Sequence, residues 1–340
     1  MADGGRTVLQ SARDHESSWP IAQAAFTAAA QAALPEQTPV VEHLGIDETQ
    51  RGKAKFRLVP GSDGGEVWEV LADRWHVGMV GLSGGAGLLG QVEGRTAASV
   101  SAWSDVQTRE WRAAVRVVAI DMCTVLRAAV RESLPHAVLV VDRFHVAQLA
   151  NAALTEVRRR VTVQHRGRWG RKDNREWELR NRLTRSAARM HADHLDPMVE
   201  DLQALPKNIG KPILAAWNAK EDLMDLLSLH GTHPDRVKIY DLLVKFYESA
   251  AASALPEMER LAGTVSTWWP QILAAITTGI TNAASEGINR LIKTDARCAF
   301  GYRNPANQRL RARCATTRRA RGHLTLHTSG RYNQPRRSKH

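Results

Sequence analysis

The chain has 340 residues, of which 43% are hydrophobic and 24% are charged, so it can bury at least one ordinary core and is not disordered as a whole. Its formal net charge of +12 exceeds what solubility needs and indicates a polyanionic partner such as nucleic acid. No apolar run approaches the roughly 18 to 20 residues of a spanning helix, and the first residues lack a signal-peptide pattern, so we expect no membrane partner and a cytoplasmic, bacterial-type protein.

The first part of the chain predicts two helices followed by strands. Residues 8–34 have helical spacing, and the second helix begins at Ser17 or Ser18 and ends before Pro35. Apolar runs separated by Gly and Asp clusters then predict an antiparallel meander of strands at Val40–Ile46, Lys55–Val59, Val67–Trp75 and Leu88–Val92. Helices and strands alternate after the meander, at Thr96–Ala114, Val115–Ile120, Thr124–Leu134 and Ala137–Val141. This order predicts a mixed sheet with helices on its faces, in the α/β (mixed α+β) class.

The strand signal ends at about His145, and the residues up to about Trp269 predict helices alone. Their helical periodicity covers Leu154–Val163, Asn174–Ala192, Pro197–Leu205, Ile213–Leu229, Pro234–Ala254 and Leu255–Trp269. We therefore expect an all-helical lobe inserted after the sheet. Gly279 and Asn282 then break the chain, and Ala283–Thr294 predicts a last helix that carries Glu286.

The net positive charge lies at the C-terminal end. From Arg297 to Lys339 there are 12 Lys and Arg residues and no acidic residue, so the remaining 35 basic residues equal the 35 acidic ones. We expect this basic segment to pack no core and to be mobile beyond about Leu324. We also expect it to bind nucleic-acid phosphates, because such binding releases counterions. The alternative is a merely solvated tail. A second basic stretch, from Arg158 to Arg175, is expected to line the same groove.

Three separated acidic residues form a candidate metal site. Asp47 and Asp121 are expected at the ends of the first and fourth strands, which would bring both carboxylates to one edge of the sheet if these strands are neighbours. A helix packed beside that edge could add Glu286. Three converging carboxylates repel one another unless a cation lies between them, and Mg²⁺ or Mn²⁺ prefers such oxygen ligands. This predicts a two-metal site for phosphoryl transfer, whereas the alternative is that the three acids are helix caps and solvated charges.

Four sequence blocks follow one another over roughly residues 40 to 305. They are LGIDE at Leu44–Glu48, VVAIDM at Val117–Met122, VVDRFHV at Val140–Val146 and TNAASEGINRLIKTDARCAFGYRN at Thr281–Asn304. In these blocks the chain resembles the DDE transposases of bacterial insertion sequences, specifically the ISL-three (ISL3) group. The resemblance implies a catalytic core folded like ribonuclease H, interrupted by an insertion before the third carboxylate.

The same resemblance implies that Asp47, Asp121 and Glu286 are the catalytic residues and bind Mg²⁺ or Mn²⁺. Asp142 competes for the second place, since it also follows a strand within a family block. We prefer Asp121, because the fourth strand neighbours the first in a ribonuclease H-like order and the fifth lies farther out.

The implied partner is double-stranded DNA, both transposon ends and target, bound by a homo-oligomer. Helical spacing places Asn282, Glu286, Asn289 and Lys293 on one face, from which the asparagine amides are expected to donate to phosphate oxygens. The predicted DNA-binding residues are Arg143, His145, Asn282, Asn289, Lys293, Arg297 and Arg303. The alternative for His145 is a satisfied, partly buried histidine.

Members of this group usually begin with a cysteine-rich zinc-binding segment and a helix-turn-helix, and here that start is missing. We interpret residues 1–38 as a partial helix-turn-helix, with a helical pair that only packs on the core as the alternative. The other predicted parts are the first part of the core at 39–150, the helical insertion at 151–275, the core helix at 276–305 and the basic tail at 306–340.

The predicted function is metal-dependent DNA strand cleavage and strand transfer at the terminal inverted repeats of an insertion sequence. One alternative is a catalytically inactive, truncated transposase that only binds DNA or poisons oligomers of the full-length enzyme. The least favoured alternative is a ribonuclease H-like nuclease that cuts branched DNA.

Overall fold

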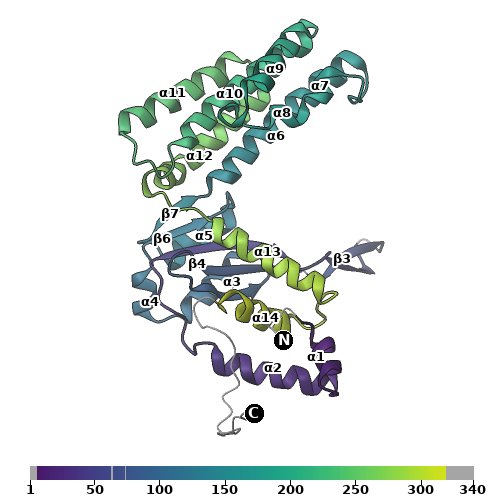
Figure 1. The fold of residues 1–340 in the computed structure, drawn as a ribbon, viewed down its shortest axis with the longest axis vertical. Helices are drawn as coiled ribbons and strands as arrows, with labels where there is room; N and C mark the ends of the chain where they lie inside the picture. The colour runs from purple at the N-terminus through teal and green to yellow at the C-terminus, as the bar shows by residue number, and fades with distance from the viewer. Residues whose placement is uncertain (1–5, 63, 73, 319–340) are drawn as a thin grey trace, which may run out of the picture. The chain divides into compact units, whose positions relative to one another are not determined.

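The computed structural model describes residues 6–62, 64–72 and 74–318, and the chain divides into two compact units (Figure 1). Unit 1 contains the described residues up to Arg95, the segment Ala102–Val115 and the described residues from Ala284 on. Unit 2 contains Thr96–Ser101 and Arg116–Ala283. Each unit therefore joins segments that are far apart in the sequence.

A five-stranded mixed sheet has the strand order β5-β4-β1-β6-β7. Its strands are β1 His43–Gln50, β4 Trp75–Gly81, β5 Gly87–Glu93, β6 Val117–Ile120 and β7 Val138–Val141. Strand β4 is antiparallel to β1 and β5, whereas β7 is parallel to β6. The fourth strand of the sheet, β6, neighbours the first, β1, and the fifth lies farther out, which confirms the predicted order and the mixed α/β class.

The predicted meander is wrong in two respects. The strand predicted over Val67–Trp75 corresponds to β3 (Glu66–Ala72), and the sequence pattern does not predict β4, which begins at Trp75. Strand β3 pairs antiparallel with β2 (Lys55–Pro60) in a separate two-stranded sheet. Gly78 and Gly81 weaken the apolar alternation of β4, which is why the sequence pattern does not predict it. A side chain at Gly81 would place its Cβ 2.7 Å from the Cβ of Ala86, so the close approach of these backbones requires glycine.

Unit 1 holds the N-terminal helices, the C-terminal helices and one short helix from the middle of the chain. They are α1 Val8–Asp14, α2 Trp19–Ala33, α4 Arg109–Ala114, α13 Ala283–Cys298 and α14 Pro305–Thr316. One face of α13 packs on the sheet, where Ile288 and Ile292 contact a cluster with Val80 and Leu88 of the strands. This packing fixes which face of α13 is left for polar residues.

Residues 305–316, expected as the start of a basic tail, form the packed helix α14. Cys314 is fully buried and contacts Phe26 and Ala30 of α2, and Figure 1 shows α2 and α14 side by side. The Arg311 side chain is also buried, because its Nε donates to Oδ1 of Asp295 over 2.7 Å. The prediction that the basic segment packs no core is therefore wrong over α14. The expectation of mobility beyond Leu324 lies outside the described residues.

Unit 2 is mainly helical. Helix α5 (Thr124–Ser133) connects β6 to β7. The helices that follow are α6 Arg143–Arg166, α7 Arg175–Glu178, α8 Arg180–Leu183, α9 Ala192–Ala204, α10 Lys207–Ser228, α11 Arg236–Ala252 and α12 Pro256–Thr278, with the 3₁₀ turn η1 Ala187–Arg189. Helix α10 packs against α6, α9 and α11, and α12 packs against α6 and α11. Within the described part of the chain, none of the helices combines the length and the apolar character that crossing a membrane requires.

The helix predicted over Thr96–Ala114 is interrupted. The chain forms α3 (Ala97–Asp105) and then a separate helix, α4. The side chain of Thr108 accepts a hydrogen bond from the backbone N–H of Trp111 over 3.1 Å and so caps the start of α4. A capping residue inside an apolar periodic run thus splits one predicted helix into two.

Candidate active site

Two aspartates of unit 2 directly follow the parallel strands. Asp121 is the first residue after β6, and Asp142 is the first after β7, as the sequence predicts. Because the two strands are parallel, their carboxyl ends lie at the same edge of the sheet, which is where sites form in such sheets. Nε2 of His145 lies 3.1 Å from Oδ2 of Asp121, and Nδ2 of Asn282 lies 3.5 Å from Oδ1.

The two aspartates have different surroundings. Asp142 is 7% exposed, and both of its oxygens accept backbone hydrogen bonds. Oδ1 accepts from Phe144 over 2.8 Å and caps α6, and Oδ2 accepts from Asn282 over 3.1 Å. The side chain of Asp121 is 28% exposed, and an imidazole and an amide contact its two oxygens. Asp142 therefore has a positioning role for two chain segments, and Asp121 has the more accessible carboxylate.

The third aspartate, Asp47, lies in unit 1. It sits inside β1 rather than at its end, because the strand begins at His43 and runs to Gln50. Its side chain is 9% exposed, and Oδ2 accepts a hydrogen bond from Nδ2 of Asn289 over 2.6 Å. Oδ1 of Asn289 in turn accepts from the hydroxyl of Thr49, which points to the same face of β1 two residues later. Asn289 thus bridges β1 and α13.

Glu286 lies on α13 one turn before Asn289, in the first turn of the helix. Its side chain is 44% exposed and its Oε1 lies 2.6 Å from Nη2 of Arg290, one turn farther along. Glu286 thus carries an ordinary surface ion pair between residues i and i+4, a kind of pair that contributes little to stability and exchanges readily. The predicted helix face is correct for Glu286 and Asn289, whereas Asn282 precedes the helix.

The remaining predicted DNA-binding residues are spread over the surface. Arg143 is exposed at the start of α6, and Lys293 and Arg297 are exposed on α13. Arg303 is exposed in the connection between α13 and α14. The amides of Asn282 and Asn289 are buried and donate to aspartates in this structure, which differs from the predicted contact with phosphate.

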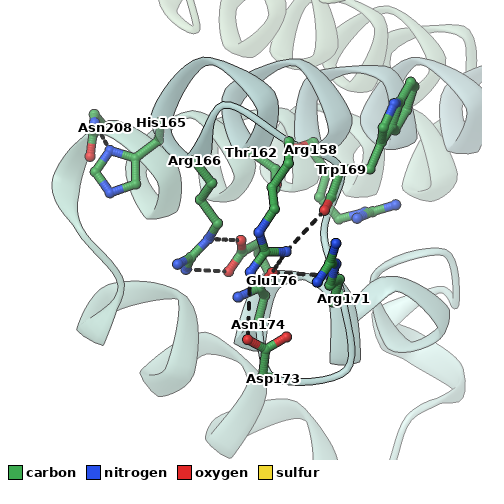
Figure 2. A network of polar contacts seen from close by, with 11 residues as sticks. Arg158, Thr162, His165, Arg166, Trp169, Arg171, Asp173, Asn174, Glu176 and Asn208 are labelled. Atoms are coloured by element: carbon green, nitrogen blue, oxygen red, sulfur yellow. Dashed lines mark hydrogen bonds and ion pairs between the residues drawn. The ribbon is translucent and has the colours of Figure 1, made fainter.

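The basic stretch from Arg158 to Arg175 was expected to line a groove with the tail, and in the structure several of its arginines pair with carboxylates of the helical lobe. Figure 2 shows Arg166 facing Glu176, and the two are joined by hydrogen bonds of 2.6 and 3.1 Å. Arg160 makes the same two-bond contact with Glu257, and Arg175 lies 2.5 Å from Asp201. Arg158 is buried. Three of these cations, Arg160, Arg166 and Arg175, are therefore paired with carboxylates of the helical lobe, although the side chain of Arg175 is 43% exposed.

The chemistry of the donor set fits a hard divalent cation. Asp47, Asp121 and Glu286 offer carboxylate oxygens, the ligands that Mg²⁺ and Mn²⁺ prefer, and amide or imidazole groups orient the two aspartates. In the ranges that the structure describes, no three His, Cys, Asp or Glu side chains are grouped as they would be around a metal ion. The carboxylates instead accept from Asn289, His145 and Asn282.

A family model described as a transposase, the DDE transposase model of the ISL3 group, matches residues 44–312. The chain belongs to the ISL3 family of DDE transposases. This match spans the five-stranded sheet, the helical lobe and α13, and so includes the three aspartates and the side chains that contact them. A search of the curated proteins finds no match.

Sequence reasoning about this transposase missed two of the polar residues at the candidate site. Thr49 follows Asp47 at the two-residue spacing of a strand, and this spacing could have placed both on one face. Arg290 follows Glu286 at the four-residue spacing that forms ion pairs on a helix. The role of Asp142 in holding the backbone at Asn282 has no signal in the sequence, because 140 residues separate the two.

Proposed function

We propose that this ISL3-family transposase uses Asp47, Asp121 and Glu286 to cleave DNA at the terminal inverted repeats of its insertion sequence and to transfer the cut strand. One observation carries the proposal. Nδ2 of Asn282 lies 3.5 Å from Oδ1 of Asp121, and Nδ2 of Asn289 donates to Oδ2 of Asp47 over 2.6 Å. Glu286 lies in the chain between these two asparagines. One short segment thus supplies the third carboxylate and a partner for each aspartate.

The choice of Asp121 over Asp142 rests on their hydrogen bonds. Both oxygens of Asp142 accept from backbone N–H groups, so this carboxylate already caps α6 and holds the chain at Asn282. The contacts of Asp121 with His145 and Asn282 are made by their side chains, which can rotate away when a cation arrives. We therefore assign the metal to Asp121 and a positioning role to Asp142.

His145 orients Asp121. The Asp121 carboxylate accepts the hydrogen of Nε2, while Nδ1 of His145 is buried and has no hydrogen-bond partner among the described residues. The contact through Nε2 orients the imidazole ring toward the carboxylate of Asp121. Asn289 acts in the same way on Asp47, since it is itself held by Thr49.

Mg²⁺ or Mn²⁺ held by Asp47, Asp121 and Glu286 would activate a water or a 3′-hydroxyl and stabilise the leaving oxygen. For Glu286 to contribute, its carboxylate must leave Arg290, and this step costs little because the pair is exposed. Arg143, Lys293 and Arg297 remain exposed cations that we expect to contact the phosphates of double-stranded DNA. We also expect a homo-oligomer, since two transposon ends must be cut and joined together.

The experiment incubates the full chain with duplex DNA that carries the terminal inverted repeats and Mn²⁺, and it follows strand cleavage on a denaturing gel. Asp121→Asn, Asp47→Asn and Glu286→Gln are each expected to abolish cleavage. The matched control is Asp193→Asn, which removes a carboxylate that is 81% exposed in the helical lobe and should cut like the parent chain.

Unchanged cleavage by Asp121→Asn would remove the assignment of that residue. A parent chain that binds the duplex with strong salt dependence but does not cut it would favour the alternative function, a DNA-binding protein without catalysis.

A further inference from the structure

Unit 1 contains a small pocket that is lined by four basic side chains and does not include the three aspartates or their partners. Arg51, Lys55, Arg74 and Arg303 line it together with Tyr302, and its volume is about 260 Å³. The residues come from the end of β1, the start of β2, the residue before β4 and the connection between α13 and α14. Four cations in so small a space repel one another unless an anion compensates them.

The position of Arg51 is fixed by its neighbours. Its backbone N–H donates to the carbonyl of Arg74 over 2.6 Å, and its Nη1 donates to the carbonyl of Tyr302 over 3.3 Å. The hydroxyl of Tyr302 is held by Asp295 over 2.6 Å, so the connection that carries Arg303 is anchored as well. Nε of Arg51 is buried and has no hydrogen-bond partner among the described residues. A buried donor without an acceptor is costly, and an anion with acceptor oxygens would satisfy it.

Glu93 offsets the positive charge of Arg51 only in part. Glu93 raises the pKa of Arg51, but Glu93 is itself ion-paired with Arg309 over 2.5 Å. Burial and the charge of Arg74 lower the pKa of Arg51. Burial, Arg309 and Arg51 likewise lower the pKa of the neighbouring His76 to about 4. Positive potential therefore dominates this part of unit 1.

We propose that the pocket of Arg51, Lys55, Arg74 and Arg303 binds a backbone phosphate of DNA. Phosphate oxygens match the guanidinium donors in geometry and charge, and Arg51 and Arg74 offer such groups side by side. Lys55 and Arg303 are exposed, so the pocket is open to a phosphate that belongs to a long chain. The choice of DNA rests on the proposed function, whereas the anion site itself rests on the pocket alone.

The test measures binding of the full chain to a short mixed-sequence duplex in EDTA, by fluorescence anisotropy, at several salt concentrations from about 50 to 200 mM. Lys55→Gln is compared with Lys53→Gln, since both are exposed lysines close together in the chain and only Lys55 lines the pocket. We expect Lys55→Gln to lower the slope of log affinity against log salt by about 0.9 and Lys53→Gln to leave it unchanged.

The double variant Arg51→Gln with Arg74→Gln should weaken duplex binding about a hundredfold, because each of the two lost charged hydrogen bonds weakens binding by roughly tenfold. Its thermal unfolding is followed alongside, so that loss of the fold is recognised. If that variant unfolds, the Lys55 and Lys53 pair decides the result alone. Equal behaviour of Lys55→Gln and Lys53→Gln would overturn the proposal.

Inorganic phosphate distinguishes the two sources of the anion. If phosphate stabilises the parent chain against heat, and the pocket variants lose this effect while they bind the duplex normally, the pocket takes free phosphate and the assignment to DNA is wrong. Since EDTA removes catalysis from the measurement, a failed cleavage assay with intact pocket-dependent binding would leave this inference standing. If the parent chain cleaves DNA normally and the pocket variants bind the duplex like the parent, the pocket inference is rejected and the proposed function stands.

Discussion

The arginines of the helical lobe and those of the unit 1 pocket differ in their electrostatic surroundings. In the lobe, Arg166 lies against Glu176, whose side chain is fully buried, and Arg160 lies against Glu257. In the pocket, Arg51 and Arg74 lie side by side with Lys55. The lobe uses its cations to satisfy buried carboxylates, whereas the pocket keeps its cations uncompensated, as an anion site requires.

The comparison teaches that a run of basic residues does not by itself mark a nucleic-acid interface. The stretch from Arg158 to Arg175 is more conspicuous in the sequence than the pocket residues are, yet Arg160, Arg166 and Arg175 within it form ion pairs with carboxylates of the lobe. The pocket gathers single residues from four separate segments. Removing a charge from an ion pair of the lobe should therefore lower the free energy of unfolding, whereas removing a cation of the pocket should leave it unchanged.

The largest expected effect is on Glu176. Glu176→Gln removes the charge that Arg166 contacts through two hydrogen bonds at a site with 0% side-chain exposure. Breaking a buried ion pair from one side costs about 3 kcal/mol, and partial exposure of Arg166 keeps the loss near this lower figure. Urea unfolding of the full chain measures it. Asp173→Asn, three residues before Glu176 but 69% exposed, should change the free energy of unfolding by less than about 0.5 kcal/mol.

His76 gives the next effect, and it depends on pH. Its folded pKa of about 4 lies below the ordinary 6.5, because burial comes first and Arg309 and Arg51 add repulsion. Between these two pH values the unfolded chain takes up a proton that the folded chain does not, so stability falls as the pH drops from 6.5 to 4. The loss is about 3 kcal/mol.

This pH dependence is checked by urea unfolding of the parent chain and of His76→Gln. The difference in slope between the two should lie within that window. A parent chain whose stability does not change across it, or a variant with the same slope, would contradict the account of the cationic cluster.

A smaller effect is expected at Glu257. Arg160 comes first among the causes that lower its pKa below the ordinary 4.5, so the pair stabilises the fold above that pH and the contribution is lost as the pH falls through the folded value. Glu257→Gln should cost about 1 to 2 kcal/mol at pH 7, since Arg160 is 33% exposed and its interaction is partly screened. Parent and variant should converge in stability at acid pH, and a constant gap at all pH values would show that the charge is not the cause.

The smallest effect is expected at Arg74, and its sign sharpens the comparison. Arg74→Gln removes a cation that lowers the pKa of Arg51 by repulsion. The free energy of unfolding should stay within about 0.5 kcal/mol of the parent value or rise. A loss as large as that of Glu176→Gln would mean that the pocket arginines are structural, like those of the lobe.

Much of the fold could be predicted from local sequence. Asp121 and Asp142 end short, fully apolar runs, and this pattern correctly placed both directly after strands. Strand β4 could not be predicted, because Gly78 and Gly81 interrupt its alternation and their role depends on the neighbouring strand. Helix α14 was missed because its basic composition hides the few buried positions, such as Cys314, that hold it on α2.

The sequence pattern predicted the elements that carry Asp121 and Glu286 but not the hydrogen bonds of the candidate site. The spacing of Glu286 and Asn289 placed them on one helix face, yet the partner of Asn289 proved to be Asp47, 242 residues away, rather than a phosphate. The pocket of Arg51 was missed for the same reason, since its members are contiguous only in the fold. Contacts between distant segments follow from packing, which a periodic pattern does not encode.

The most direct test of the central claim is Mn²⁺ binding to the full chain, measured by electron paramagnetic resonance in Asp47→Asn, Asp121→Asn, Glu286→Gln and Asp142→Asn. Asparagine caps a helix about as well as aspartate, so the last variant keeps the cap of α6 and serves as the control. Its amide nitrogen cannot accept the second hydrogen bond, from the backbone N–H of Asn282, so thermal unfolding of this variant is measured alongside. The account predicts that the first three variants lose Mn²⁺ binding and that Asp142→Asn retains it. Retention by Asp121→Asn together with loss in Asp142→Asn, or unchanged binding in Glu286→Gln, would contradict it.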